Sequence, residues 1–189
     1  MDRSLNREIK AFCPDFVPVR HLLEDLGATL IGIKDQIDSH YHLPAGDGGA
    51  GTRRLKLRNE TGKQELIYYC DVQVDGARTS RFQVWELDDI QIGAALEASL
   101  GIRAVVRKRK ELWHWENVVF NLDVVEGVGQ IMEVEVQDRD DRDINAQITE
   151  YRRILTPYLD NDIVGSNENL VPETSLRREG FRTRSKRTS

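Results

Sequence analysis

The sequence lacks most of the features that mark membrane-spanning, secreted or disulfide-stabilised proteins. Only two of its 189 residues are cysteines, Cys13 and Cys70, and they form no C-x-x-C pair. We expect both to be reduced and partly buried, as in an intracellular protein. No apolar run approaches the length of a bilayer span, and charged residues interrupt the first ten positions where a signal peptide would need apolar ones. We therefore expect a cytoplasmic protein without membrane association.

An excess of positive charge is also lacking. The chain carries 27 basic and 32 acidic residues, which gives a formal net charge of −5. Residues 173–189 hold six basic and two acidic side chains, a local charge of +4, so residues 1–172 carry −9. A broad basic surface for nucleic acid is therefore disfavoured. We predict one domain over residues 1–172 and a disordered basic tail over 173–189, suited to an acidic partner or to nuclear import.

Alternation of apolar and polar residues covers most of the chain, and three stretches have helical spacing instead. The predicted strands are residues 4–12, 29–43, 53–59, 64–72, 79–86, 102–114, 117–125 and 130–138. The predicted helices are residues 14–27, 88–100 and 141–159. About eight successive strands with few helices favour an α+β fold built on an antiparallel sheet or barrel.

Five predicted strands carry a charged face backed by an apolar one, because side chains two apart on a strand share a face. The charged faces are Asn6, Glu8 and Lys10; Arg54, Lys56 and Arg58; Arg107, Arg109 and Glu111; Asn121 and Asp123; and Glu133 and Glu135. One explanation is a half-buried sheet with its charged face in water. The other is a closed barrel with these faces inward, and its lumen would need ligands to neutralise it. Basic side chains bind phosphate oxygens and carboxylates bind Mg²⁺ or Mn²⁺, so a polyanion and divalent metals are the expected contents.

Seven short motifs follow one another in a distinctive order. They are N-R-E-I-K at 6–10, L-E-D-L-G-A at 23–28, R-L-K-L-R at 54–58, E-L-I-Y-Y at 65–69, G-I-R-A-V-V-R-K-R at 101–109, L-D-V-V-E-G-V-G at 122–129 and E-V-E at 133–135. Through them residues 4–170 resemble the CYTH superfamily of triphosphate tunnel enzymes, especially its class IV adenylate cyclase branch. The resemblance implies a closed eight-stranded antiparallel β-barrel, the tunnel, with flanking helices, which binds a triphosphate together with Mg²⁺ or Mn²⁺.

The resemblance also implies a role for each matching residue. The carboxylates that correspond to metal ligands are Glu8, Asp123, Glu133 and Glu135. The cations that correspond to phosphate-binding residues are Lys10, Arg54, Lys56, Arg58, Arg107 and Arg109. Lys10, Arg58 and Glu133 are the predicted catalytic residues, and Glu126 matches the glutamate of a glycine turn. Asn6 and Val124 stand where relatives have acids, which predicts that one of two metal sites is weaker. Cys70-Asp71 stands where relatives have a base, and an aspartate there would repel phosphate.

The implied chemistry leaves two enzymes and one binding protein open. Attack by the 3′-hydroxyl of ATP on the α-phosphorus yields cyclic AMP and pyrophosphate, whereas attack by water on the terminal phosphorus is triphosphatase activity. The alternative to an enzyme is a module that only binds nucleotide or polyphosphate. The expected ligands are a nucleoside triphosphate, thiamine triphosphate or inorganic polyphosphate. A separate H-x-H pair, His40 and His42, lacks a third ligand at metal-binding spacing.

Overall fold

The computed structural model describes residues 6–44, 51–74, 77–88, 91–138 and 142–171, so the predicted tail lies outside the described residues. The strands are β1 (Asn6–Phe12), β2 (Thr29–Tyr41), β3 (Gly51–Glu60), β4 (Lys63–Val74), β5 (Ala77–Leu87), β6 (Ile102–Trp115), β7 (Val118–Val125) and β8 (Gly129–Gln137). The helices are α1 (Phe16–Asp25), α2 (Ile92–Leu100) and α3 (Ile144–Leu155), followed by the 3₁₀ turns η1 (Thr156–Tyr158) and η2 (Asn167–Asn169). The predicted α+β fold with eight antiparallel strands is confirmed.

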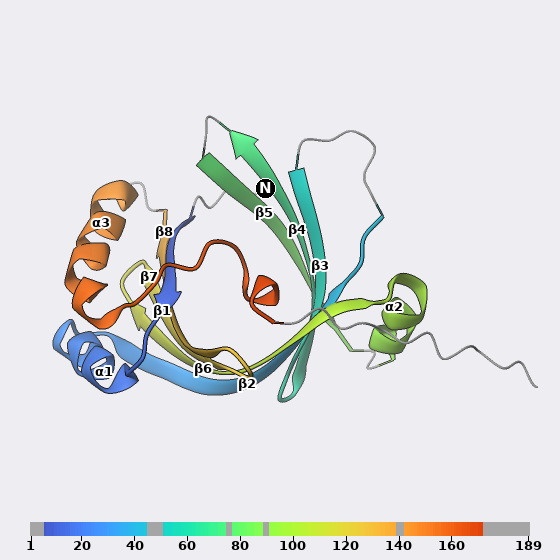
Figure 1. The fold of residues 1–189 in the computed structure, drawn as a ribbon, viewed down its shortest axis with the longest axis horizontal. Coiled ribbons are helices and arrows are strands. Elements are labelled where there is room, and N and C mark those ends of the chain that lie inside the picture. Colours follow the sequence, from blue (N-terminus) through green and yellow to red (C-terminus); the bar gives the residue numbers. More distant parts are fainter. Residues whose placement is uncertain (1–5, 45–50, 75–76, 89–90, 139–141, 172–189) are drawn as a thin grey trace, which may run out of the picture.

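The strands form one sheet in the order β1-β8-β7-β6-β2-β3-β4-β5. Figure 1 shows this sheet strongly bent, with β1, β8 and β7 on one side and β3, β4 and β5 on the other. Among the described residues no hydrogen-bonded ladder joins the edge strands β1 and β5. The expectation of a closed barrel is therefore corrected to a bent sheet that hydrogen bonds do not close.

The edge of β1 is covered instead by the segment after α3, residues 159–171, which we call the C-terminal segment. Asp160 N–H donates to the Phe12 carbonyl at 2.8 Å, and Ile163 N–H donates to the Lys10 carbonyl at 2.9 Å. These bonds occupy the backbone groups that a neighbouring strand would need to close the sheet. Figure 1 shows the C-terminal segment passing from the β1 edge across the inner side of the bend.

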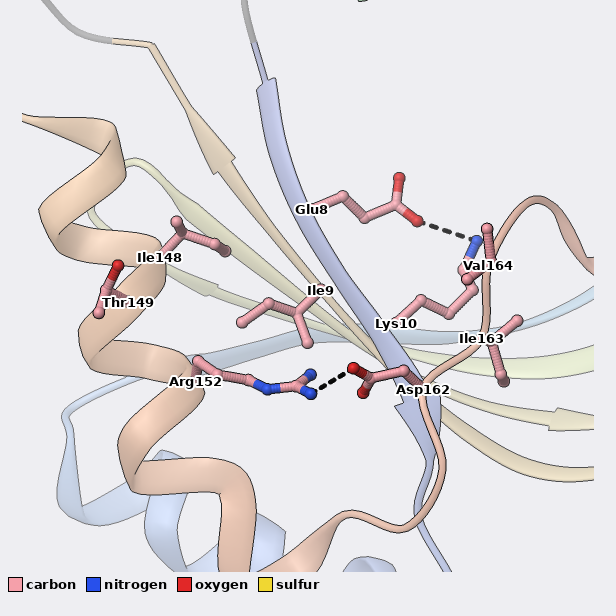
Figure 2. Close-up of a pocket in the computed structure, with 9 residues that line it drawn as sticks. All are labelled: Glu8, Ile9, Lys10, Ile148, Thr149, Arg152, Asp162, Ile163 and Val164. Carbon is pink, nitrogen blue, oxygen red and sulfur yellow. Dashed lines mark hydrogen bonds and ion pairs between the residues drawn. The ribbon is translucent and has the colours of Figure 1, made fainter. Parts of the chain in front are cut away.

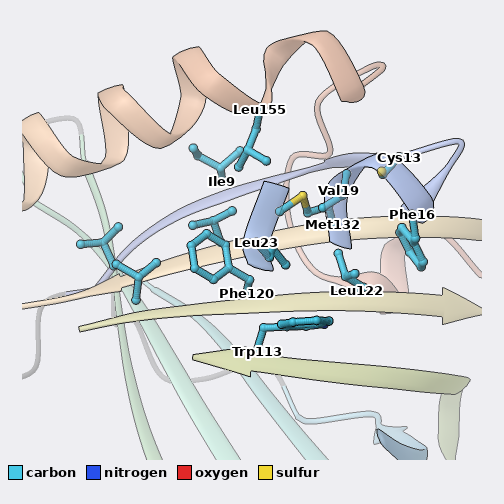
Figure 3. Packing of buried hydrophobic residues seen from close by; sticks show 13 residues of the cluster. Ile9, Cys13, Phe16, Val19, Leu23, Trp113, Phe120, Leu122, Met132 and Leu155 are labelled. Carbon is cyan, nitrogen blue, oxygen red and sulfur yellow. The ribbon is translucent and has the colours of Figure 1, made fainter. Parts of the chain in front are cut away.

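The main hydrophobic core lies on the outer side of the sheet, under α1 and α3. Successive strands place Ile9, Val134, Phe120 and Trp113 in one row, because these residues lie opposite one another in the ladders. Figure 3 shows Ile9, Phe120 and Trp113 of this row, with Leu155 contributed by α3. Burying one face of the sheet in this way requires the alternation seen in the sequence.

The first helix begins where its sequence predicts. Asp15 accepts a hydrogen bond from the backbone N–H of Val17 at 2.9 Å, which satisfies one of the free donors at the start of α1. Phe16, Val19 and Leu23 are buried on one face of the helix. Of the two cysteines, Cys13 is buried beside this helix and Cys70 is half-buried, and both are free. No helix within the described part of the chain is long and apolar enough to cross a membrane.

Candidate functional site

The inner face of the bent sheet collects the polar side chains that the outer core excludes. Residues opposite each other in an antiparallel ladder share a face, and the ladders join Glu8 to Glu135, Lys10 to Glu133 and Asp38 to Arg58. Across the sheet this face carries Glu8, Lys10, Gln36, Asp38, His40, Arg54, Lys56, Arg58, Lys108, Lys110, Asn121, Asp123, Glu133 and Glu135. On the same face, Val106 and Ile131 pack against Ile163 of the C-terminal segment. Most of the predicted site residues therefore converge on one surface.

Lys10 lies between two of the predicted metal ligands. Its ammonium is 3.0 Å from a Glu8 carboxylate oxygen and 3.5 Å from a Glu133 oxygen. Burial alone would raise the pKa of Glu133, but Lys10, Lys110 and Lys108 lower it to about 2. Burial and the nearby Glu133 charge raise the pKa of Glu8. Glu133 is thus the ionised centre of this cluster near neutral pH.

A pocket of about 400 Å³ opens at the edge of β1, between that strand, α3 and the C-terminal segment. Figure 2 shows Glu8 and Lys10 on one side of it and the exposed Arg152–Asp162 ion pair on another. The Glu8 side chain is 45% exposed. The carboxylate end of the inner face is therefore open to solvent at this edge.

The carboxyl group of Glu135 has a raised pKa. Burial and the charge of Glu133 raise its pKa from 4.5 to about 7. Because the unfolded chain ionises this carboxyl at a lower pH than the folded protein does, the folded state loses stability as pH rises from about 4.5 to about 7. A cation bound among these carboxylates would reverse that cost.

We expect Glu135→Gln to raise the free energy of unfolding of the metal-free protein by about 2 kcal/mol at pH 8 and to change it little at pH 4.5. Glutamine mimics the protonated carboxyl, so it removes a penalty that exists only above the unfolded-state pKa. Urea unfolding in EDTA at the two pH values measures the difference. Glu126→Gln, at an exposed turn residue, is the control and should have no such pH dependence. An equal gain at both pH values would contradict the assignment.

The β6–β7 region holds a buried ion pair and two oxygens without hydrogen-bond partners. The Lys108 ammonium donates to Asp123 Oδ2 at 2.6 Å, and the Asp123 side chain is completely buried. The other oxygen, Asp123 Oδ1, has no hydrogen-bond partner, and neither does Asn121 Oδ1 on the same face. Buried acceptors without partners are rare in proteins, so these two oxygens mark a place where a donor or a cation would be stabilised.

Asp38 lies between the cations of β3. One oxygen accepts from Lys56 at 2.8 Å, and both oxygens accept from Arg58 at 2.9 and 3.1 Å. Despite its burial, these two cations hold the pKa of Asp38 far below its usual range. Lys56 itself is buried, and that burial lowers its pKa to about 8. Asp38 keeps both basic side chains extended over the inner face without any ligand present.

A second carboxylate, Glu168 of the C-terminal segment, lies near the other end of the row of β3 cations. Glu168 lies 2.8 Å from Arg103, 3.2 Å from His40 and 3.9 Å from Arg54, and its side chain is only 1% exposed. Burial lowers the pKa of His40 to about 4. His40 is therefore a neutral, buried side chain next to Glu168. Over the described ranges, no group of three or more His, Cys, Asp or Glu side chains is arranged to hold a metal ion.

The structure does not bring Arg107 and Arg109 to the inner face. The β2–β6 ladder pairs Gln36 with Lys108, so the inward positions of β6 are Lys108 and its alternate neighbours. Arg107 is exposed, and Arg109 is 63% exposed and lies 3.9 Å from Asp35. These two arginines are therefore corrected to outer-face residues.

The same register places Val124 away from the inner face. It lies opposite Arg109, on the outer face, and it is exposed. The missing acid at this position therefore removes no carboxylate from the inner face. Next to it, Glu126 is exposed in a turn closed by a 3.1 Å bond from the Val128 N–H to the Val125 carbonyl. Gly127 adopts a φ of +73° there, so the E-G-x-G motif has a structural role.

Several inner-face residues were not identified by sequence reasoning. Lys108 and Lys110 are hidden in the charged run from Arg107 to Glu111, because a run of charges does not show which positions face inward. Alternation from the buried Val106 would have given their phase. Asp38 is on the same alternation as His40. Glu168 lies outside regular strands, and no local pattern indicates its distant partners.

Comparisons with known proteins identify related sequences and folds. The CYTH domain matches residues 5–163. A solved structure from Pyrococcus horikoshii OT3 has a TM-score of 0.73 and 24% identity, covering 89% of this chain and all of that one. A comparison with curated proteins found no match.

Two further solved structures have informative descriptions. A Vibrio parahaemolyticus protein described as a candidate adenylate cyclase has 15% identity and a TM-score of 0.66, covering 89% of this chain and 98% of that one. A Hippeastrum protein described as a candidate adenylyl cyclase with a dominant triphosphatase activity has 15% identity and a TM-score of 0.57, covering 87% and 93%. At these identities the structures support the tunnel fold.

Proposed function

The chain belongs to the CYTH domain family, and on this premise we propose that it binds a triphosphate and a divalent cation on the inner face and cleaves a phosphorus–oxygen bond of that ligand. Members of this family bind triphosphates and are typically triphosphatases or adenylate cyclases. The finer assignment for this chain rests on the arrangement of its own charges. The alternative is a module that binds a nucleotide or polyphosphate without cleaving it.

The observation that carries the proposal is the separation of charge across the inner face. Cations of β3 (Arg54, Lys56 and Arg58) lie on one side of the bend, and carboxylates of β1 and β8 (Glu8, Glu133 and Glu135) lie on the other. The lysines of β6 lie between these two groups in the strand order. Burying so many ionisable groups is unfavourable unless they are paired with one another or with a ligand. A metal-bound polyanion complements both groups at once.

The chemistry of the donors suits a hard divalent cation, although the described carboxylates would have to converge to hold one. Glu8, Glu133 and Glu135 offer carboxylate oxygens, and Asp123 Oδ1 and Asn121 Oδ1 are the buried oxygens without partners. All are the oxygen ligands that Mg²⁺ and Mn²⁺ prefer, and CYTH proteins generally use divalent metals. When bound, such a cation would neutralise charge on the phosphate oxygens. The mutual repulsion that raises the pKa of Glu135 also favours a cation at this place.

The basic residues would bind and orient the phosphate chain. Arg58 offers planar guanidinium donors and Lys56 a point charge, both already held in place by Asp38. Lys110, whose pKa burial and Lys108 lower to about 8, can donate to phosphate oxygens near neutral pH. Lys10 would approach the same oxygens from the carboxylate side. Stabilising charge that develops on the reacting phosphoryl group accounts for most of the catalysis in such reactions.

Product-resolved turnover tests this proposal. Purified protein is given ATP, thiamine triphosphate or inorganic tripolyphosphate with Mg²⁺ or Mn²⁺. Cyclic AMP plus pyrophosphate would establish a cyclase, and orthophosphate release would establish a triphosphatase. The described neighbours include candidates for both outcomes. Binding of a triphosphate without turnover would leave the binding module, and neither binding nor turnover would contradict both.

We expect Arg58→Met to weaken triphosphate binding by about ten- to a hundredfold, because it removes a charge-assisted contact. Arg109→Met is the matched control, since it removes the same charge from the outer face. Titration calorimetry with tripolyphosphate compares the two variants. Equal losses would mean that overall charge, and not the inner face, attracts the ligand.

A further inference from the structure

Two aromatic side chains extend the row of β3 cations toward the edge of the sheet. Arg54, Tyr69 and Phe82 lie opposite one another on β3, β4 and β5. The Arg54 guanidinium lies 4.6 Å from the centre of the Tyr69 ring, and the Lys56 ammonium lies 5.5 Å from it. The two rings have centroids 6.1 Å apart and are tilted by 42°. Charge and aromatic surface are therefore continuous on one face.

The two rings differ in their surroundings. Tyr69 is half-buried under the cations, and burial raises its pKa to about 12, so it stays a neutral phenol. Phe82 is 51% exposed on edge strand β5, and Val84, two residues along the same face, is 45% exposed. Exposed apolar side chains are common, and what distinguishes Phe82 is its place in the same cross-strand row as Arg54 and Tyr69. The exposed side of Phe82 is a flat apolar surface beside the phosphate-binding cations.

Distance along the sheet determines what could reach this surface. Neighbouring strands lie about 4.8 Å apart, so the β5 row is about 10 Å from the β3 row. Inorganic tripolyphosphate bound on Lys56 and Arg58 has nothing to place on an apolar ring. A triphosphate ester can extend its organic group across two strands, and aromatic groups stack on such rings.

We propose that Phe82, supported by Tyr69, is the stacking surface for the aromatic ring of an organic triphosphate. This inference rests on the proposed function and adds its substrate class: a triphosphate ester of a ring-bearing group, such as a nucleoside, in preference to an inorganic polyphosphate. A nucleobase and the rings of thiamine share the chemistry that Phe82 recognises. The two are separated by experiment.

The test compares ligands with and without a ring. Titration calorimetry, in EDTA and again with Mg²⁺, measures the binding of ATP, thiamine triphosphate and inorganic tripolyphosphate to the wild type and to Phe82→Ala. We expect Phe82→Ala to weaken binding of one or both esters by about tenfold, within the range of base stacking on an aromatic side chain. Tripolyphosphate binding should change less than twofold. The ester that loses affinity identifies the ring.

Two variants control for indirect effects. Trp85→Ala removes an aromatic residue that is 45% exposed on the opposite face of β5, so it should leave all three affinities unchanged. Phe82→Trp keeps a flat ring and should retain ester binding. Equal weakening of tripolyphosphate by Phe82→Ala, or no effect on either ester, would overturn the inference while leaving the proposed function intact. If the wild type binds none of the three ligands, both fail.

Discussion

Replacing Glu133 with alanine is expected to lower triphosphate turnover by about a hundred- to a thousandfold or more, the scale seen when one preorganised charge is lost from an active site. Glu133 is buried, ionised and 3.5 Å from Lys10, and it is flanked by Glu8 and Glu135. Its removal takes the central negative charge from the metal-binding carboxylates. Initial rates at saturating Mg²⁺ measure the loss.

Glu126→Ala is the control for this variant, because it removes the same side chain from an exposed turn on the same chain. It should keep turnover within twofold of the wild type. The affinity of the metal-free protein for tripolyphosphate is the second readout. Glu133→Ala should leave that affinity similar or higher, since a negative charge has been removed near the phosphates. Full turnover in Glu133→Ala would exclude a catalytic role for this carboxylate.

The second large effect concerns stability. Asp123→Leu is expected to lower the free energy of unfolding by about 3–5 kcal/mol, because it leaves the Lys108 ammonium buried without its partner. Lys108→Met in the same chain should restore most of the loss, since two apolar residues then replace the pair. Urea unfolding in EDTA removes any contribution from bound metal.

A surface ion pair provides the comparison. Asp162→Ala breaks the Arg152–Asp162 pair, whose side chains are 41% and 52% exposed, and should cost at most about 1 kcal/mol. A loss for Asp123→Leu no larger than this would mean that water reaches the Lys108 ammonium. If the double variant does not regain stability, the loss in Asp123→Leu comes from altered packing and not from the unpaired Lys108 charge.

The strands were predictable because one face of the sheet is buried under helices. Ile9 and Val134 alternate with Lys10 and Glu133, and this alternation fixes both the strand and the side on which each residue lies. The charged sites on β1, β3 and β8 could therefore be located from sequence. On β6 five charged residues occur in succession, so local composition does not show which positions face inward, and Arg107 and Arg109 lie on the outer face contrary to the prediction.

Closure of the sheet was not predictable from the same information. Strand count and alternation are compatible with an open or a closed sheet, and the difference depends on what binds the β1 edge. Here Asp160 and Ile163 bind that edge, and Glu168 enters the inner face from the same irregular segment. Contacts between residues so distant in sequence leave no periodic signal. They became visible only with the folded chain.

The strand order also determines when the two charged halves can be assembled during synthesis. The strands β2 to β5 pair with sequence neighbours, so the half of the sheet that carries Arg54, Lys56 and Arg58 can form soon after it leaves the ribosome. Strand β1 has to wait for β8, the last strand to be made, before its carboxylate and lysine acquire their partners. Such long-range pairing slows folding. A nascent chain therefore presents the cations of β3 before the carboxylates of β1 and β8 are brought together, and truncation before β8 would leave Arg54, Lys56 and Arg58 in place without Glu133 and Glu135.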